Sequence, residues 1–371
     1  MLGSSSVLVN NQESLHSEWF AGRIIDWQQQ YGRCGLPWQG ADAYRIWLSE
    51  IMLQQTRVAT VIPYYLRFVD RFPAIPVLAA ESEEMVLAYW SGLGYYSRAR
   101  NLHSASRIIM QQHNGEFPHQ FKDILALPGI GRSTAAAISA FAFHERCAIL
   151  DGNVKRLLAR YYAIDGYPGE QKIEAMLWEK AEALLPEKNV AIYTQGMMDL
   201  GATICTRSKP ECCRCPVQAG CVAHRNGCVA LLPTPRLRKK LPERKTTFLL
   251  LRNGSDILLE KHTGRVIWGG LWCPPQLDIQ IPGDIESVRV YCRQFFNVEV
   301  INVLALPKFL HTFTHFKLHI FPLLIDVAVE DTLKAQETGM AWMGLDDAQC
   351  AAIPSPVRKL LQEIQKNCWE S

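Results

Sequence analysis

The sequence lacks any long apolar run, since no stretch approaches the roughly 20 consecutive apolar residues that a membrane-spanning helix needs. Its first residues also lack a basic start followed by an apolar stretch, so a secretory leader is not expected. Internal repeats and low-complexity tracts are missing as well. These absences predict a soluble cytoplasmic protein with no membrane partner, and we expect it to act as a monomer.

A strong net charge is also missing. The 39 Lys and Arg residues nearly balance the 36 Asp and Glu residues, which leaves a formal net charge of +3. That charge is too small to establish a polyanionic partner, so any case for nucleic-acid binding rests on local motifs.

The length of 371 residues exceeds one typical domain, and 48% hydrophobic with 20% charged residues is ordinary globular composition. We therefore expect two domains.

Cysteines, by contrast, are concentrated in one short segment. Four of them follow the spacing C-x6-C-x2-C-x5-C and are Cys205, Cys212, Cys215 and Cys221. Four thiolates with such short spacers can bind a 4Fe-4S cluster or a zinc ion with little loop-closure cost. Structural zinc sites usually contain two C-x2-C pairs, whereas only Cys212 and Cys215 form one here, so the spacing favours the 4Fe-4S cluster. Disulfides are not expected without a secretory leader.

Apolar spacing and turn signals divide the chain into two parts. Residues 16–226 have apolar residues at three- and four-residue spacings, which predicts an all-α domain. Residues 232–245 are rich in Pro, Arg and Lys, as is typical of an exposed linker. The rest predicts an α+β domain with a hairpin turn at 252–255, a strand at 318–327 and helices at 285–296 and 356–366. The expected boundaries are 1–230 for the first domain, 231–245 for the linker and 246–371 for the second domain.

The basic residues near the linker have two interpretations. They would follow the phosphates of a DNA backbone, or they would simply be solvated. The residues are Arg236, Arg238, Lys239, Lys240, Arg244 and Lys245.

A turn with two glycines lies within the helical part. The residues L-P-G-I-G-R-S-T at 127–134 separate two helical patterns, which predicts a helix-hairpin-helix at about 121–143. Gly129 and Gly131 would let the backbone approach a phosphate, and the N–H groups at the start of the second helix are donors for an anion. Such contacts bind DNA without reading its sequence. A plain turn between two helices is the alternative.

Two carboxylates are candidates for catalysis. Asp151 precedes a helix that we expect to begin near Asn153, where its carboxylate would stay ionised and could stabilise a developing positive charge on a sugar. Glu50 lies among apolar residues in segment 47–57, which is helical by its pattern, and partial burial would raise its pKa so that it acts as a general acid. The alternatives are a simple helix cap for Asp151 and a surface position for Glu50.

Together the helix-hairpin-helix, the L-D-G-N-V segment at 150–154 and the cysteine spacing resemble the endonuclease III superfamily of DNA glycosylases. Within it, four segments are similar to the adenine DNA glycosylases of the MutY family, namely residues 47–57, 92–102, 127–135 and 150–156. The resemblance extends from about residue 19 to 230 and continues more weakly to the C-terminus. It implies a base-excision-repair enzyme with a 4Fe-4S cofactor. Its partner would be double-stranded DNA with adenine opposite 8-oxoguanine or G, from which the flipped adenine is removed by hydrolysis.

The resemblance also implies roles for individual residues. Glu50 would protonate the flipped adenine and Asp151 would stabilise an oxocarbenium-like sugar, in keeping with the split pKa values of paired carboxyl groups at glycosidic sites. Asn153 matches an active-site residue of the family, although it would also suit a helix cap. The residues that match family positions intruding at the lesion pair are Gln55, Leu93 and Tyr95, and the last two would otherwise serve as packing in the turn.

The C-terminal part resembles the Nudix-like module with which the family reads 8-oxoguanine. The similarity lies in G-G-L-W at 269–272 and in H-T-F-T-H-F at 311–316. It implies lesion contacts from Phe313, Thr314 and His315, with threonine at a position where the family has serine. Pyrophosphatase activity is not expected, because Nudix hydrolases bind magnesium through a glutamate-rich helix and residues 286–296 contain one carboxylate.

Position 133 distinguishes two enzymatic alternatives. The lyase members of the superfamily carry a lysine there, whose amine attacks the sugar, whereas this chain has Ser133. We therefore expect a monofunctional glycosylase, with a bifunctional pyrimidine glycosylase as the second hypothesis. The third is a cluster-bearing DNA-binding sensor, in which Glu50 and Asp151 would have no catalytic role.

Overall fold

The computed structural model describes residues 4–236, 240–264, 267–277, 285–329 and 339–367, with side chains from Leu15 onward. No helix in these ranges is both long and apolar enough to cross a membrane. By its contacts the chain divides into two compact units, which are Met1–Ala79 with Ser104–Arg238 and Ala80–His103 with Lys239–Ser371. The second unit therefore includes a segment of the helical part. The expected domain boundary at residue 230 is based on the order of motifs along the chain, whereas the two units are defined by which residues contact one another.

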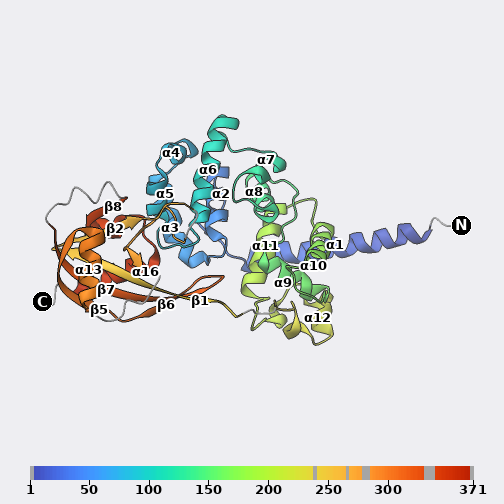
Figure 1. Ribbon diagram of the computed structural model, residues 1–371. Helices are drawn as coiled ribbons and strands as arrows, with labels where there is room; N and C mark the ends of the chain where they lie inside the picture. The colour runs from blue at the N-terminus through green and yellow to red at the C-terminus, as the bar shows by residue number, and fades with distance from the viewer. Residues whose placement is uncertain (1–3, 237–239, 265–266, 278–284, 330–338, 368–371) are drawn as a thin grey trace. The chain divides into compact units, whose positions relative to one another are not determined.

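The first unit is helical, as predicted, and its elements appear in blue to yellow-green in Figure 1. Together with α4 and α6, which extend into the second unit, its helices are α1 (Ser4–Tyr31), α2 (Ala43–Leu53), α3 (Val58–Arg71), α4 (Ile75–Ala80), α6 (Ser97–Gln112), α7 (Phe121–Ala126), α8 (Arg132–Phe143), α9 (Gly152–Tyr161), α10 (Gln171–Ala183), α11 (Val190–Thr203) and α12 (Val222–Arg225). Single turns of 3-10 helix follow in the cysteine-rich loop at Cys212–Arg214 and Gln218–Gly220.

The core of the first unit lies between α1, α8, α9, α10 and α11. Helix α9 contributes Val154, Leu158 and Tyr161, which recur at three- and four-residue spacing and are all buried. Helices α1 and α11 approach so closely that a Cβ at Gly196 would lie 2.7 Å from Cγ2 of Ile24. A second close approach, at Gly201, brings α11 beside the start of α9.

Two local predictions can be compared with these helices. The helix-hairpin-helix is confirmed, because α7 and α8 flank the turn that contains Gly129 and Gly131. The prediction that residues 47–57 are helical is wrong at its end, since α2 stops at Leu53. Gln55 has a left-handed backbone with φ of 57°, which a continuous right-handed helix does not accommodate.

In its described residues, the second unit contains helix α5 and a mixed sheet with helices α13, α15 and α16. Its elements are α5 (Glu83–Trp90), β1 (Glu243–Asn253), β2 (Asp256–Lys261), β3 (Trp272–Cys273), β4 (Gln276–Leu277), α13 (Ile285–Phe296), β5 (Val298–Ala305), β6 (Phe309–Thr312), β7 (Lys317–Val329), β8 (Met340–Gly344), α15 (Leu345–Cys350) and α16 (Ser355–Asn367). The strand order is β3-β2-β1-β7-β5, and β4, β6 and β8 pair with β1, β7 and β2. Strands β1 and β7 are parallel, whereas the other pairs are antiparallel.

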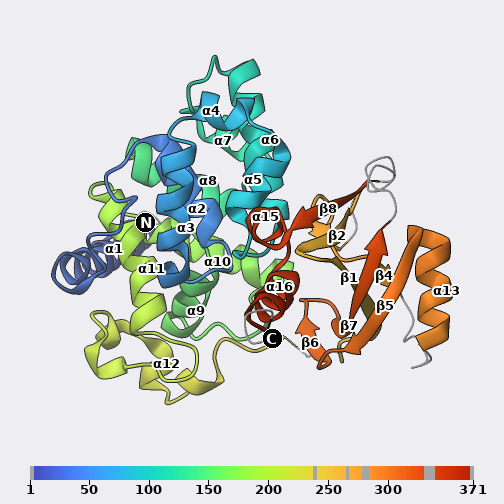
Figure 2. The ribbon, with the colours of Figure 1, turned by 90° about the vertical axis from the view of Figure 1, so that its left-hand side faces the viewer.

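Helices cover both faces of this sheet, as Figure 2 shows for α13 and α16. Alternate residues of β1 enter two cores: Phe248 and Leu250 pack with residues of α16, whereas Leu249 and Leu251 pack with residues of α13. A strand buried on both faces reads as a continuous apolar run, which explains the character of this segment. The predicted α+β class, the hairpin turn between β1 and β2 and the long strand at 318–327 are confirmed. Strand β1 begins at Glu243, so the last residues of the expected linker belong to the sheet.

Candidate active site

Glu50 lies in the last turn of α2 and is partly buried. Its neighbours on the helix, Trp47 and Ile51, are almost completely buried. Burial, and next the negative charge of Asp151, raise the pKa of the Glu50 carboxyl from 4.5 to about 7. No hydrogen bond or ion pair of this carboxyl occurs among the residues that the structure describes. The raised pKa agrees with the predicted effect of partial burial, and the role of Glu50 as a general acid stays a prediction.

Asp151 is the N-cap of α9, as its position before the helix predicts. Its Oδ1 accepts hydrogen bonds from the backbone N–H of Asn153 at 3.0 Å and of Val154 at 2.8 Å. Burial raises the pKa of Asp151, and these hydrogen bonds oppose the rise. The pKa of Asp151 is raised overall, whereas a position at a helix start alone predicts a lowered pKa. The sequence does not reveal how deeply the carboxyl is buried, and burial is the larger effect.

The two carboxyl groups have different environments. Asp151 accepts three hydrogen bonds, which stabilise its ionised form, whereas the Glu50 carboxyl interacts mainly with apolar surroundings and with the charge of Asp151. Because donors favour the carboxylate of Asp151 and none reaches the Glu50 carboxyl among the described residues, Glu50 is the group of this pair that more readily holds a proton. This is the combination that cleavage of a glycosidic bond requires.

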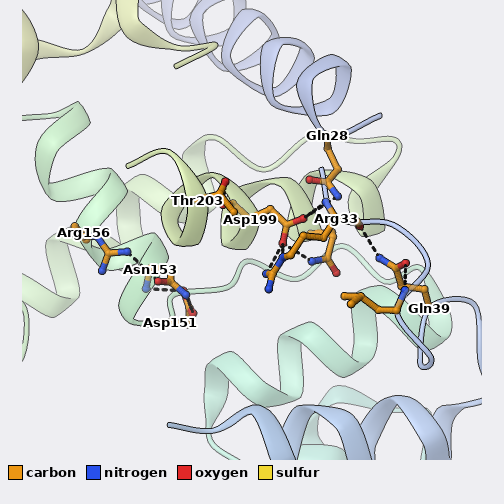
Figure 3. A network of polar contacts seen from close by, with 10 residues as sticks. Gln28, Arg33, Gln39, Asp151, Asn153, Arg156, Asp199 and Thr203 are labelled. Carbon is orange, nitrogen blue, oxygen red and sulfur yellow. Dashed lines mark hydrogen bonds and ion pairs between the residues drawn. The ribbon is translucent and has the colours of Figure 1, made fainter. Parts of the chain in front are cut away.

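A chain of hydrogen bonds leads from Asp151 toward the cysteine-rich loop (Figure 3). Asn153 Nδ2 donates to Asp151 Oδ2 at 3.0 Å, and Asn153 Oδ1 accepts from Arg156 Nη2 at 2.9 Å. Arg156 also donates through Nε to the carbonyl of Cys205 at 2.8 Å and through Nη2 to that of Gly201 at 2.6 Å. The amide of Asn153 is thus oriented from both sides. The sequence analysis missed Arg156, because a lone arginine on an exposed-looking helix carries no distinctive pattern.

Gly201 is a second residue that the sequence analysis missed. It lies on α11, and a Cβ at this position would meet Asn153 Cβ at 2.7 Å and the Asn153 carbonyl oxygen at 2.9 Å. Only glycine permits this approach of α11 to the start of α9.

Ser133 also has a defined contact, since its Oγ accepts from the backbone N–H of Leu150 at 3.0 Å. The hydroxyl therefore supports the residue that precedes Asp151.

Asp199 of α11 forms a further polar centre in Figure 3. It is completely buried and pairs with the Arg33 guanidinium at 2.5 Å. It also accepts from Gln28 Nε2 at 3.1 Å and from Gln195 Nε2 at 2.7 Å. The carboxylate joins the end of α1 and the segment after it to α11.

The helix-hairpin-helix presents backbone N–H donors at the start of α8. Gly129 has a φ of 80°, which allows the tight turn, and Gly131 is the N-cap of the 12-residue helix. The first hydrogen bond within α8 is donated by Ala135 to the Gly131 carbonyl, so the preceding N–H groups point out of the helix end. They can bind an anion such as a phosphate. Gln54 Nε2, which donates to the Gly129 carbonyl at 3.2 Å, connects the end of α2 to this turn.

The residues expected at the lesion pair differ in their exposure. Tyr95 is 45% exposed and Leu93 is 6% exposed, and Gln55 is also exposed. Gln55 and Tyr95 have left-handed backbones with φ of 57° and 49°. Such strain in non-glycine residues is common at binding sites. Leu93 packs inside the protein, which is the alternative weighed for it.

In the second unit, Thr314 and His315 form the exposed tip of the loop between β6 and β7. Thr314 Oγ1 lies 3.3 Å from His315 Nδ1. Phe313 stacks on the buried ring of Phe316 at 4.4 Å between centroids, and its N–H donates to the Phe316 carbonyl at 2.9 Å. The contacts between Phe313 and Phe316 thus hold the two ends of the loop together, and its tip presents two polar side chains. Helix α13 carries one acidic residue, Glu286, in its first turn.

The four cysteines of the predicted cluster site line one cavity of the first unit. Cys213 is exposed and is not part of the lining. Among the described residues, no group of three or more His, Cys, Asp or Glu side chains meets metal-ligating geometry.

Arg160 gives an independent test of whether a cluster fits this cavity. Its side chain is 2% exposed, donates to the carbonyls of Leu232 at 2.8 Å and Thr206 at 2.7 Å, and lies 3.3 Å from Cys205 Sγ. No carboxylate pairs with Arg160 among the described residues. A buried guanidinium needs a negative neighbour, and cluster-bound thiolates provide one. The donor set and the charge around the cavity therefore fit an iron-sulfur cluster.

Of the basic residues near the linker, Arg238 and Lys239 lie outside the described residues. Arg236, Lys240, Arg244 and Lys245 are exposed.

Comparison with known proteins gives matches to both parts of the chain. Residues 48–183 match the family described as HhH-GPD superfamily base excision DNA repair protein, and residues 246–363 match the NUDIX domain. The chain is 38% identical over 351 residues to the adenine DNA glycosylase of Buchnera aphidicola subsp. Acyrthosiphon pisum (strain APS), which covers 94% of this chain and 99% of the relative. It is 30% identical over 406 residues to the adenine DNA glycosylase of Rattus norvegicus. This alignment covers 94% of this chain and 78% of the relative. A solved structure of a thermostable thymine-DNA glycosylase is 28% identical with a TM-score of 0.53, over 58% of this chain and 99% of that one.

Proposed function

The chain belongs to the family of adenine DNA glycosylases, enzymes of base-excision repair that hydrolyse an N-glycosidic bond, and we propose that it removes adenine mispaired with 8-oxoguanine or with G. The observation that carries this proposal is the pairing of Glu50, whose pKa is raised to about 7, with the hydrogen-bonded carboxylate of Asp151. The proposed place of action, the cytoplasm with its nucleoid DNA, follows from this substrate. We expect the protein to act as a monomer.

In the proposed reaction, Glu50 donates its proton to the ring of the flipped adenine as the N-glycosidic bond breaks. The bond electrons leave with the base, and the sugar becomes oxocarbenium-like. The Asp151 carboxylate stabilises that positive charge, and Asn153 keeps the carboxylate oriented. Water then adds to the sugar and gives its proton to Glu50, which restores the starting state.

Ser133 supports a monofunctional reaction. A lyase step needs an amine that attacks the sugar, and the Ser133 hydroxyl instead accepts from the Leu150 N–H. The hypothesis of a bifunctional pyrimidine glycosylase therefore stays second. The extent of the match to adenine glycosylases, which includes the NUDIX domain, also favours the first hypothesis.

DNA binding would use several surfaces. The N–H groups at Gly131 and the start of α8 would hold a phosphate, with Gly129 allowing its close approach. Gln55 and Tyr95, whose side chains are exposed, are proposed to enter the duplex at the lesion pair. Leu93 is buried in this structure, so its entry would require the turn to open. The proposed contacts to 8-oxoguanine come from the loop tip with Phe313, Thr314 and His315.

We further propose that a 4Fe-4S cluster is bound by the four cysteines of the cavity, Cys205, Cys212, Cys215 and Cys221. When bound, it joins the cysteine-rich loop through four thiolate bonds and adds negative charge beside Arg160. This chain's own residues connect that loop to the catalytic end of α9, through Arg156 and Asn153.

The test is an excision assay on duplexes that contain adenine opposite 8-oxoguanine, G or T, followed by alkali to break abasic sites. We expect strand breaks at the adenine opposite 8-oxoguanine and, more slowly, opposite G, and none with Glu50→Gln. Tight binding without strand breaks in a cluster-loaded sample would instead favour the DNA-binding sensor. Strand breaks without alkali would favour the bifunctional enzyme.

A further inference from the structure

The second unit joins a segment of the helical part to the NUDIX-like sheet at several points. Glu84 on α5 accepts from Lys261 Nζ at 2.6 Å and from Trp272 Nε1 at 2.5 Å. Arg100 Nη1 on α6 donates to the Gly269 carbonyl at 2.6 Å. These contacts place the turn between α5 and α6 within the same compact unit as β2 and β3.

The turn itself is bound at both of its ends by one carbonyl group. The Ile353 oxygen accepts from Ser91 Oγ at 2.5 Å and from Tyr96 Oη at 3.2 Å. Ser91 Oγ in turn accepts from Arg358 Nη2 at 2.8 Å, so the hydroxyl is both donor and acceptor. Ser91 and Ile353 are buried, which shields these bonds from water.

The backbone between these two ends has a positive φ at three residues. Gly92, Gly94 and Tyr95 have φ of 102°, 74° and 49°. A left-handed backbone at Tyr95 is unfavourable and persists only where the surroundings impose it. Ser91, Tyr96 and the segment with Ile353 and Arg358 bind the ends of this turn. In its middle, Trp90 Nε1 and Arg98 Nη2 both donate to the Gly94 carbonyl at 3.1 Å, so these local contacts and the bonds at the ends together determine how the exposed Tyr95 ring is presented.

We propose that Ser91, Tyr96 and Arg358 are positioning residues, through which the NUDIX-like part fixes the turn that inserts Tyr95 into DNA. The inference rests on the proposed function, in which this turn enters the duplex at the lesion pair. The NUDIX-like part then has two roles. Its loop with Thr314 and His315 contacts 8-oxoguanine, and its Ile353 carbonyl supports the turn at residues 91–96 without contacting DNA there.

The first test compares Ser91→Ala and Tyr96→Phe with the wild-type chain. Duplexes carry 2-aminopurine beside the adenine opposite 8-oxoguanine, so that its fluorescence reports unstacking of the helix. Each variant loses a hydroxyl that donates to the Ile353 carbonyl, and we expect about tenfold weaker binding and a smaller fluorescence rise. Ser255→Ala is the matched control, because it removes an exposed hydroxyl of the same unit from the turn between β1 and β2.

A double-mutant cycle with Tyr95→Ala separates positioning from general destabilisation. If Ser91 acts through the turn, Ser91→Ala has almost no further effect in the Tyr95→Ala background. The inference is overturned if Ser91→Ala weakens DNA binding as much in the Tyr95→Ala background as in the wild type. It is also overturned if Ser91→Ala and Tyr96→Phe both bind DNA and raise the fluorescence as the Ser255→Ala control does. A wild-type chain that does not excise adenine opposite 8-oxoguanine refutes the proposed function instead, so the two failures are distinguishable.

Discussion

Arg156 donates its Nε–H to the carbonyl of Cys205 at 2.8 Å, and so connects the helix that follows Asp151 with the first cysteine of the cysteine-rich loop. The same guanidinium holds Asn153 at 2.9 Å. One side chain thereby fixes both the orientation of Asn153 and the start of the cysteine-rich loop.

Replacing Arg156 by Met should therefore reduce the single-turnover excision rate about 10- to 100-fold, because Asn153 loses a partner and Asp151 loses its fixed geometry. Iron content should fall as well, since the carbonyl of Cys205 is released. The measurements are single-turnover kinetics and iron analysis of the same samples. Arg293→Met, at an exposed position on α13, is the control and should leave both values unchanged.

The excision rate should depend on the protonation of Glu50. Its pKa of about 7 predicts a single-turnover rate that falls about tenfold per pH unit above this value. The pH profile of the rate, measured at saturating protein, checks this. A rate that stays level from pH 6 to pH 9 would contradict the assignment of Glu50 as the general acid.

Stability should change with pH in a related way. The folded state raises the Glu50 pKa above its ordinary 4.5, so this group's contribution to stability is full below about pH 4.5 and is lost as the pH rises through about 7. Glu50→Gln cannot ionise and should be more stable than the wild type at pH 8, by up to about 3 kcal/mol. Urea unfolding at pH 4.5 and pH 8 measures the difference, which should vanish at the lower pH. Glu116→Gln, at an exposed position, is the matched control substitution.

Two helical glycines give a matched pair of substitutions. Gly201→Ala would place a Cβ against the backbone of Asn153 and should destabilise the protein by about 1–3 kcal/mol while lowering the excision rate. Gly22→Ala on α1 meets no atom within 4 Å and should stabilise the protein by about 0.5–1 kcal/mol, because alanine favours helix. Thermal unfolding and single-turnover kinetics distinguish the two. Equal effects of both substitutions would argue against a close approach at Gly201.

Cluster loading should depend on four cysteines and not on a fifth. Cys212→Ser or Cys215→Ser should lower iron and sulfide content and make the loop from Cys205 to Cys221 sensitive to protease, because the cluster would order this segment. Cys213→Ala should keep full iron content, since Cys213 is exposed and outside the cavity. Iron and sulfide analysis with limited proteolysis is the measurement. Four irons retained in Cys215→Ser would contradict the ligand set.

The sequence by itself determined what depends on neighbours along the chain. The turn with Gly129 and Gly131, the hairpin between β1 and β2 and the cap at Asp151 follow from local backbone preferences, and each is confirmed. Gln55 is an exception at this level. Its left-handed backbone ends α2 early, although the apolar pattern continues past it.

Only the tertiary structure decided which distant residues meet and how deeply they are buried. The pKa of Glu50 depends on burial and on the charge of Asp151, neither of which a local pattern contains. The need for glycine at 201 arises from the approach of α11 to α9, and the role of Arg156 arises from contacts to separate segments. The grouping of Ala80–His103 with the sheet likewise comes from packing, because hydrogen bonds such as Ser91 to Ile353 join segments far apart in the chain. Local patterns encode helices and turns, whereas burial and charge pairing arise only when the folded chain brings these segments together.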